Sequence, residues 1–301
     1  MKLPFSYAHA HPYVFGGIAP PASFDEAKTV LLPVPLDRTT SYVPGTRYGP
    51  REILGASAQT ELWDEELQID VSAAAVLTLP EMELPFAALD EALAEVRRVA
   101  QAIVDRDKFL IVLGGEHSIT PPIVAAVSAR HRGVSVLQID AHADLRETYL
   151  GNRDSHACAM RRTLEHARVT QVAIRSISQA EAEAVPGLPT TIFYDITMRQ
   201  DPQWIDRVVE SLSDTVYLTV DFDGLDPAIM PAVGTPEPGG LSWHELLALL
   251  RAVFARRRVV ACDLVELCPI PGLVAPNLLG ARLVYKILAY YLGRDRLRER
   301  R

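Results

Sequence analysis

Two imidazoles and four carboxylates, spread over three short motifs, are the side chains of this sequence best suited to binding metal ions. One histidine follows two glycines in residues 114–118, Gly-Gly-Glu-His-Ser. A second lies between carboxylates in Asp140-Ala-His-Ala-Asp144, and two more carboxylates alternate in Asp221-Phe-Asp223. Alternate residues of an extended chain share one side, so each alternating motif directs its polar groups together. Burying such groups without a counter-charge is costly, and a bound cation removes that cost.

The number and kind of these candidate ligands favour two ions over one. A single zinc ion prefers four mixed nitrogen, sulfur and oxygen ligands. A carboxylate-rich set suits hard or borderline ions such as Mn²⁺. Two divalent cations would balance the four aspartates, which leaves a neutral cluster. The six candidate ligands are His117, Asp140, His142, Asp144, Asp221 and Asp223.

Each motif directly follows an apolar, β-branched run that predicts a strand. The predicted strands are 30–34, 109–113, 134–139, 171–174, 190–193, 216–220 and 259–264. Several are continuously apolar, which is typical of parallel strands with helices on both faces. Between them, helical spacing predicts helices over 86–104, 243–256 and 278–292. This alternation predicts a doubly wound α/β sheet, in which ligands bind beyond the carboxyl ends of the strands.

Composition excludes several classes of protein. The chain has 301 residues and a formal net charge of −8, and this acidic excess argues against a nucleic-acid partner. No apolar run reaches the roughly 20 residues that a membrane span needs, and the N-terminus lacks the apolar core of a signal peptide. Three cysteines form neither a disulfide framework nor a zinc pattern, so we expect them to be buried and reduced. A cytoplasmic protein with no membrane partner is predicted.

The domain organisation follows from the absence of any repeat, low-complexity tract or flexible linker in the sequence. A single domain is predicted over residues 1–301. Within it we expect an N-terminal arm over 1–24 and a frayed basic end over 294–301.

Taken in order, the motifs resemble those of the ureohydrolase (arginase and agmatinase) family. The resemblance rests on residues 114–118, 140–144, 221–227 and 234–241, and it extends from Pro35 to Pro269. Residues 44–50, Pro-Gly-Thr-Arg-Tyr-Gly-Pro, resemble the agmatinase branch in particular. The resemblance implies a three-layer αβα sandwich with a mainly parallel sheet. It also implies two Mn²⁺ ions per subunit and a homo-oligomer, either a trimer or a hexamer.

The resemblance further implies how the candidate ligands are shared. One ion would be held by His117, Asp140, Asp144 and Asp221. The other would be held by His142, Asp140, Asp221 and Asp223. Two aspartates, Asp140 and Asp221, would therefore bridge the ions.

Roles for three further residues come from the same resemblance. Glu266 matches the glutamate that binds the substrate guanidinium, and a carboxylate can pair with that group in a bidentate way. Thr235 would steady this carboxylate. His156 matches the histidine that passes a proton to the leaving amine, a step worth about 10²–10⁴-fold in rate.

The stretch before His156 bears on the substrate. Residues 145–157 lack the arginase pattern that binds an amino-acid head group, and Ala157 stands where arginase has glycine. A small cationic guanidino compound without that head group is favoured, and agmatine, cleaved to putrescine and urea, is the first choice. Candidate contacts for its tail are Arg146, Glu147, Tyr149, Asn152 and Arg153.

Several alternatives remain open on the sequence. The substrate can instead be guanidinobutyrate or arginine, because Arg146 or Arg153 suits a carboxylate. A non-catalytic, metal-stabilised homologue is a second alternative, although the ligand set is complete. A dimetal phosphoesterase is a third, but it would need cationic groups where the anion Glu266 stands.

Overall fold

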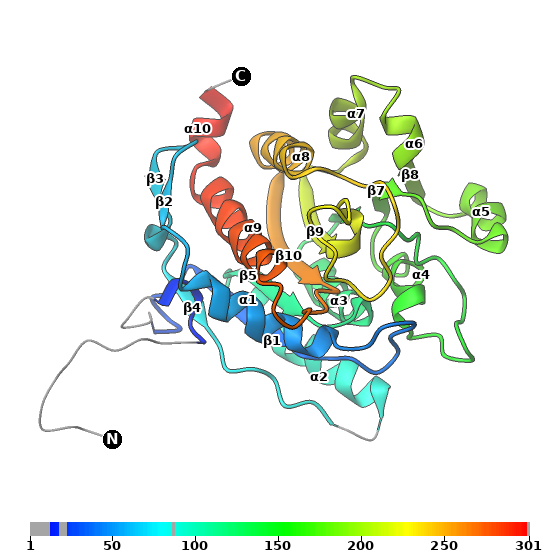
Figure 1. The fold of residues 1–301 in the computed structure, drawn as a ribbon, viewed down its shortest axis with the longest axis horizontal. Coiled ribbons are helices and arrows are strands. Elements are labelled where there is room, and N and C mark those ends of the chain that lie inside the picture. The colour runs from blue at the N-terminus through cyan, green and yellow to red at the C-terminus, as the bar shows by residue number, and fades with distance from the viewer. Residues whose placement is uncertain (1–12, 18–22, 86–87, 300–301) are drawn as a thin grey trace, which may run out of the picture.

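The computed structural model describes residues 13–17, 23–85 and 88–299 (Figure 1). At its centre is an eight-stranded sheet in the order β4-β1-β5-β10-β9-β6-β7-β8. All neighbouring strands in this sheet run parallel. Its strands are β1 (Thr29–Val34), β4 (Val76–Thr78), β5 (Phe109–Gly114), β6 (Ser135–Ile139), β7 (Val169–Ile174), β8 (Thr190–Tyr194), β9 (Thr215–Asp221) and β10 (Arg258–Val265). A short antiparallel pair lies apart from it, β2 (Trp63–Asp64) and β3 (Ile69–Asp70).

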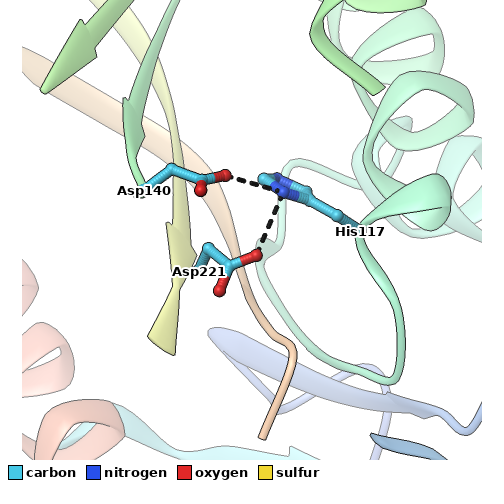
Figure 2. A group of neighbouring side chains, drawn as sticks. All are labelled: His117, Asp140 and Asp221. Carbon is cyan, nitrogen blue, oxygen red and sulfur yellow. Dashed lines mark ion pairs between the residues drawn. The ribbon is translucent and has the colours of Figure 1, made fainter. Parts of the chain in front are cut away.

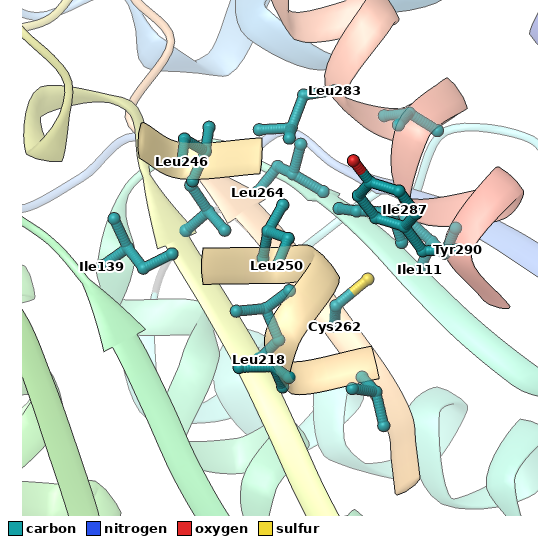
Figure 3. Packing of buried hydrophobic residues seen from close by; sticks show 14 of the residues in the cluster. Ile111, Ile139, Leu218, Leu246, Leu250, Cys262, Leu264, Leu283, Ile287 and Tyr290 are labelled. Atoms are coloured by element: carbon teal, nitrogen blue, oxygen red, sulfur yellow. The ribbon is translucent and has the colours of Figure 1, made fainter. Parts of the chain in front are cut away.

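Helices cover both faces of the sheet, because alternate strand residues point to opposite sides. In β5, Ile111 and Leu113 belong to a core shared with α1, α8 and α9 (Figure 3). Leu110 and Val112 belong to a second core, shared with α2 and α3. The helices are α1 (Gly49–Ser57), α2 (Leu89–Val104), α3 (Thr120–Arg130), α4 (Ala159–Thr163), α5 (Gln179–Ala184), α6 (Asp195–Met198), α7 (Trp204–Ser211), α8 (Trp243–Arg256), α9 (Ala275–Leu292) and α10 (Arg294–Glu299).

The predicted αβα sandwich with a parallel sheet is confirmed. Each predicted strand overlaps a strand of the sheet, with ends that differ by one or two residues. A capping box starts α8: the Ser242 hydroxyl accepts the Glu245 backbone amide, and the Glu245 carboxylate accepts the Ser242 amide. The three cysteines are buried and free. Strand β4 was not expected from the sequence, because its three residues at the sheet edge are only half-buried.

The two ends of the chain differ in part from expectation. Most of the predicted arm over 1–24 lies outside the described residues, but Phe15 is buried in the core beside α1. Residues 294–299 form the regular helix α10 and bury Leu297, whereas a frayed end was expected. The single domain over 1–301 stays a prediction. No helix within the described ranges combines the length and apolar character that crossing a membrane requires.

The turn after β5 depends on a close approach between two chain segments. The Gly115 amide donates to the Val34 carbonyl at 2.9 Å, and the next amide donates to the Leu36 carbonyl at 2.8 Å. A Cβ at Gly115 would lie only 1.8 Å from the Leu36 carbonyl oxygen. The glycine is therefore needed because backbone occupies the space of a side chain, and not because φ is positive.

We predict that Gly115→Ala destabilises the protein by at least about 1–3 kcal/mol, the usual cost of overpacking. Backbone cannot move aside as a flexible side chain can. Gly55→Ala is the matched control, since Gly55 lies on the exposed side of α1 with nothing within 4 Å of its Cβ position. It should be neutral or stabilising by up to about 1 kcal/mol. Urea unfolding would measure both, and equal stability of the two variants would contradict the prediction.

Candidate metal centre and substrate pocket

The three ligand motifs and Glu266 lie at the carboxyl ends of four adjacent strands. The sheet order β5-β10-β9-β6 brings together the loops after these strands, although the strands are far apart in sequence. His117 lies in the turn after β5, Asp140 directly after β6, and Asp221 is the last residue of β9. Their side chains point toward one another (Figure 2). Parallel strand order, and not proximity along the chain, therefore assembles this site.

The Nδ1 atom of His117 faces three carboxylates at once. It lies 3.1 Å from Asp140 Oδ2, 3.2 Å from Asp144 Oδ2 and 3.3 Å from Asp221 Oδ2. The His117 side chain is 1 % exposed, and this nitrogen makes no hydrogen bond. Few buried polar atoms lack a partner, so an orphan nitrogen surrounded by anionic oxygens needs an explanation.

A second group of ligand atoms adjoins the first. His142 Nδ1 lies 3.0 Å from Asp223 Oδ2 and 3.7 Å from Asp140 Oδ1. Backbone amides hold these carboxylates in place: His142 donates to Asp140 at 2.6 Å, and Ala141 donates to Asp223 at 3.1 Å. Within each of the sets His117–Asp140–Asp221 and Asp140–His142–Asp223, one ligand atom per residue lies within 4.8 Å of the others. Asp140 belongs to both sets.

Burial and like charge perturb the pKa values of these groups. Burial raises the pKa of Asp221 well above its usual value, and the charges of Asp223 and Asp140 raise it further. Burial alone would lower the pKa of His142, but the carboxylates of Asp223 and Asp140 outweigh it and raise the pKa to about 12. The carboxylates around His117 likewise overcome its burial and raise its pKa. Excess negative charge is thus concentrated here.

These residues fit divalent cations. An unprotonated Nδ1 would place a lone pair among carboxylate oxygens, which is the donor set that a borderline or hard divalent ion accepts. Because Asp140 contributes to both groups, two cations held by them would be neighbours. The observation that supports this fit is the buried, unpartnered Nδ1 of His117.

A cavity of about 290 Å³ opens over this cluster. Its inner wall includes five of the six candidate ligands, all but the fully buried Asp140, together with Glu266, His156 and Thr235. Its outer wall is formed by Ser41, Arg146, Tyr149, Ser176, Ile177, Ser178 and Glu181. Five predicted ligands and both predicted catalytic residues therefore border one space.

Glu266 is held rigidly at the bottom of the cavity. Its Oε1 accepts the His117 backbone amide at 2.7 Å, and its own amide donates to the Gly115 carbonyl at 2.8 Å. Its φ is +66°, a conformation that side-chain-bearing residues rarely adopt. Burial raises its pKa well above the usual value, and the charges of Glu116 and Asp223 add to the rise. A cation next to Glu266 would relieve this repulsion.

His156 lies in the same cavity and is half-buried. Its Nε2 lies 3.2 Å from the Ser41 hydroxyl. Its Nδ1 lies 3.2 Å from the Thr39 hydroxyl and 3.3 Å from that of Ser155. The edge of the ring meets the Tyr149 ring at a centroid distance of 5.9 Å. Both ring nitrogens thus lie within reach of hydroxyl groups that can donate or accept.

Two residues predicted to contact the substrate, Thr235 and Asn152, form hydrogen bonds within the protein. The Thr235 hydroxyl donates to Asp223 Oδ2 at 3.3 Å and not to Glu266. Asn152 is not among the described residues that line the cavity, because its Oδ1 accepts the Asp154 amide at 2.8 Å in a tight local turn. Tyr149 takes the position facing the pocket. A threonine and an asparagine in loops have several nearby partners, and the sequence does not select among them.

The other candidate tail contacts also separate into two groups. Arg146 lines the cavity together with Tyr149. Glu147 instead pairs with Arg161 at 2.7 Å, and Arg153 pairs with Glu165 at 2.9 Å. The last two residues therefore belong to surface ion pairs.

Comparison with known proteins agrees with this geometry. The model of the Arginase family matches residues 27–289. The N(1)-aminopropylagmatine ureohydrolase of Synechocystis sp. is 40% identical, over 89% of this chain and 90% of that protein. The agmatinase of Bacillus cereus is 33% identical, over 82% and 86%. The crystal structure of agmatine ureohydrolase of Thermoplasma volcanium superposes with a TM-score of 0.84 at 33% identity, over 91% of this chain and 93% of that one.

The chain belongs to the arginase family. It is a hydrolase of the ureohydrolase type, with two groups of histidine and aspartate side chains able to hold metal ions.

Two residues that the sequence analysis missed organise the loops of this ureohydrolase. Glu116 is fully buried and accepts hydrogen bonds from the Thr39 amide at 2.6 Å and the Ser118 hydroxyl at 2.6 Å, which ties the loop holding Thr39 to the first motif. Arg175 donates to the carbonyls of Asp223 at 2.6 Å and Glu237 at 3.0 Å. Glu116 lay inside a recognised motif and could have been noted there; Arg175 gave no signal.

We predict that removing divalent ions with a chelator lowers the melting temperature of this ureohydrolase. The clustered carboxylates lose their counter-charge, and a ligand at 100 times its Kd contributes about 2.7 kcal/mol. For a chain of this size that corresponds to a shift on the order of 5 °C. Differential scanning fluorimetry with and without chelator and added Mn²⁺ would measure it. The double variant Asp140→Asn, Asp221→Asn should lose the metal-dependent increment, and an unchanged wild-type melting temperature would contradict the clustering of charge.

Proposed function

We propose that this ureohydrolase cleaves the guanidino group of agmatine, giving putrescine and urea, at a centre that holds two Mn²⁺ ions. His117, Asp140, Asp144 and Asp221 would hold one ion. His142, Asp140, Asp221 and Asp223 would hold the other. When bound, such ions lower the pKa of water from about 15.7 to about 7 and so supply a nucleophile at neutral pH.

One observation supports this proposal above the others. His117 has two relevant contacts. Its unpartnered Nδ1 faces three carboxylates, and its backbone amide donates to Glu266. Metal ligand and guanidinium acceptor are therefore fixed to each other by a 2.7 Å hydrogen bond. A substrate held by Glu266 would lie directly beside the cations. A phosphoesterase is disfavoured, because this carboxylate would repel a phosphate.

Glu266 would orient the reacting carbon. The His117 amide uses part of the bonding capacity of Oε1, which leaves Oε2 and a remaining Oε1 lone pair for two parallel guanidinium N–H groups. Such a pairing fixes the guanidinium plane, and correct orientation is a main source of rate enhancement. The cationic substrate would also offset the negative charge that raises the pKa of Glu266.

His156 would deliver the proton that the departing amine needs. Attack of water on the guanidino carbon and cleavage of its bond to the alkyl-bearing nitrogen release urea only if that nitrogen is protonated. His156 borders the cavity, and the hydroxyls of Ser41 and Thr39 face its two ring nitrogens. They would orient the ring and connect it to solvent.

The outer part of the cavity favours a cationic tail. Glu181 is the anionic residue of its outer wall, and Glu237, which does not line the cavity, lies nearby at 3.9 Å from His142 Nε2. Arg146 is the cation there, but it lies 3.8 Å from Glu181 and over the Tyr149 ring. The net charge of these groups is negative, which suits the ammonium end of agmatine better than a carboxylate.

N(1)-aminopropylagmatine is the second candidate substrate. A further hollow of about 300 Å³ continues past the cavity and shares Arg146, Ser178 and Glu181 with it. An aminopropyl extension and its one added cationic group would have room along this path. The relative that is 40% identical bears the name of that substrate.

We predict that the Mn²⁺-loaded protein releases urea from agmatine and from N(1)-aminopropylagmatine. With arginine and guanidinobutyrate, kcat/KM should be lower by at least about tenfold, since one unfavourable charge contact of about 1.4 kcal/mol gives that factor. A colorimetric urea assay over the four compounds would measure this. Preferential cleavage of a carboxylated compound would reverse the substrate assignment, and release from none of them would remove the proposed activity.

We predict that His156→Ala lowers kcat by about 10²–10⁴-fold, the usual value of a positioned proton donor. Mn²⁺ content should stay at the wild-type level, because His156 is not among the clustered ligand residues. Ser155→Ala is the neighbouring control, since its hydroxyl makes only one of the three contacts to the His156 ring. Steady-state kinetics and elemental analysis would give both quantities. Full activity in His156→Ala would rule out its role in proton transfer.

A further inference from the structure

Two glutamine side chains lie inside the central sheet, next to the second ligand motif. Gln138 is on β6, and the strand register pairs it directly with Gln171 on β7. Both are fully buried, in strands whose other residues are mostly apolar. Burying an amide is costly unless its polar groups are hydrogen-bonded. The position of this pair therefore calls for a reason beyond packing.

Four hydrogen bonds connect the two amides to the motif that follows β6. Gln171 Nε2 donates to the Ala143 carbonyl at 2.7 Å and to Gln138 Oε1 at 2.6 Å. Gln138 Nε2 donates to Asp140 Oδ2 at 2.7 Å and to the His142 carbonyl at 3.3 Å. The two amides thus use all four of their protons, and one of these protons goes to a candidate metal ligand.

The direction of these hydrogen bonds does not depend on the charge of any group. A carbonyl oxygen only accepts, so the Gln171 atom beside the Ala143 carbonyl must be its nitrogen. That nitrogen also faces Gln138, which must therefore present its oxygen there and direct its own nitrogen to Asp140. The His142 carbonyl, a second group that only accepts, requires the same orientation. Gln138 is thus fixed as a donor to Asp140.

Each oxygen of Asp140 then receives one N–H donor and faces one imidazole. Oδ2 accepts the Gln138 amide and lies 3.1 Å from His117 Nδ1. Oδ1 accepts the His142 backbone amide at 2.6 Å and lies 3.7 Å from His142 Nδ1. A carboxylate oxygen has about two lone-pair sites, so each oxygen keeps one for a cation. The backbone amide holds one side of this carboxylate, and Gln138 holds the other.

We propose that Gln138 is a positioning residue that holds Asp140 so that each of its oxygens stays directed at a different cation-binding group. The inference rests on the metal centre proposed above and adds a residue that does not touch the cations. Groups that hydrogen-bond to a metal ligand typically change metal affinity by 10–100-fold. Gln171 and the His142 carbonyl keep the Gln138 amide from turning over, which would place its oxygen against the carboxylate.

Gln138→Met tests the role of the donor, because it keeps the length of the side chain and removes the amide. Mn²⁺ affinity, measured by competition with a metal-chelating dye, should fall about 10–100-fold. Gln171→Met is the matched control. It removes an equally buried amide from the neighbouring strand but leaves Gln138 both of its acceptors. It should keep Mn²⁺ affinity within about threefold, below the range for a direct partner of a ligand, even if the metal-free protein melts at a lower temperature.

The double variant Gln138→Met, Gln171→Met separates affinity from stability. Removing both partners of a buried hydrogen bond costs less stability than removing one and leaving the other unsatisfied. The double variant therefore decides the matter if Gln138→Met does not fold, and it should lose Mn²⁺ affinity to the same extent. Wild-type affinity in Gln138→Met or in the double variant would overturn the inference, as would equal losses in Gln138→Met and Gln171→Met. Urea release by the wild type is measured separately, so Mn²⁺ binding without urea release would reject the proposed function and leave this inference standing.

Discussion

Repulsion among buried carboxylates is the constraint on which the rest of this structure depends. Asp140, Asp144 and Asp221 all approach one ring nitrogen of His117 within 3.3 Å, and Asp223 approaches His142 within 3.0 Å. Among the ion pairs of the described residues these aspartates meet imidazoles, never lysine or arginine. Such a cluster is stable only where the fold prevents the groups from moving apart and where positive charge is supplied.

The fold meets the first requirement with backbone contacts. Amides of the loops donate to the carboxylates of Asp140, Asp221 and Asp223. A Cβ at Gly224 would lie 2.7 Å from the Asp140 nitrogen, so the loops after β6 and β9 pack backbone against backbone. Because main-chain groups are less free to rearrange than long side chains, the negative groups stay close despite their repulsion. The positions of these three carboxylates are therefore held by backbone groups of the loops.

Features that depend on one segment of the chain were predictable from the sequence, whereas features that depend on contacts between distant segments were not. Strands and ligand motifs were predictable because apolar runs and alternating polar residues express a period of two along one segment. The order of the strands is not expressed in any one segment, so the pairing of Gln138 on β6 with Gln171 on β7 was out of reach. The hydrogen-bond partners of Asn152 and Thr235 were out of reach for a related reason. Their short polar side chains can bond to several neighbours, and the local turn, which sequence periodicity does not describe, decides which one.

The inner part of the cavity, which would hold the cations, and the outer part, which would hold the substrate tail, are built from different interactions. Near the carboxylates, buried hydrogen bonds connect several strands, so that a change in one group disturbs the others. Around Arg146, Tyr149 and Glu181, the contacts involve one loop and the start of α5, and Arg146 is partly exposed to water. Exposed charge pairs contribute little to stability. Exposed residues of the outer wall, such as Arg146, can therefore change at little cost to the fold, whereas the buried carboxylates and imidazoles of the inner cluster cannot.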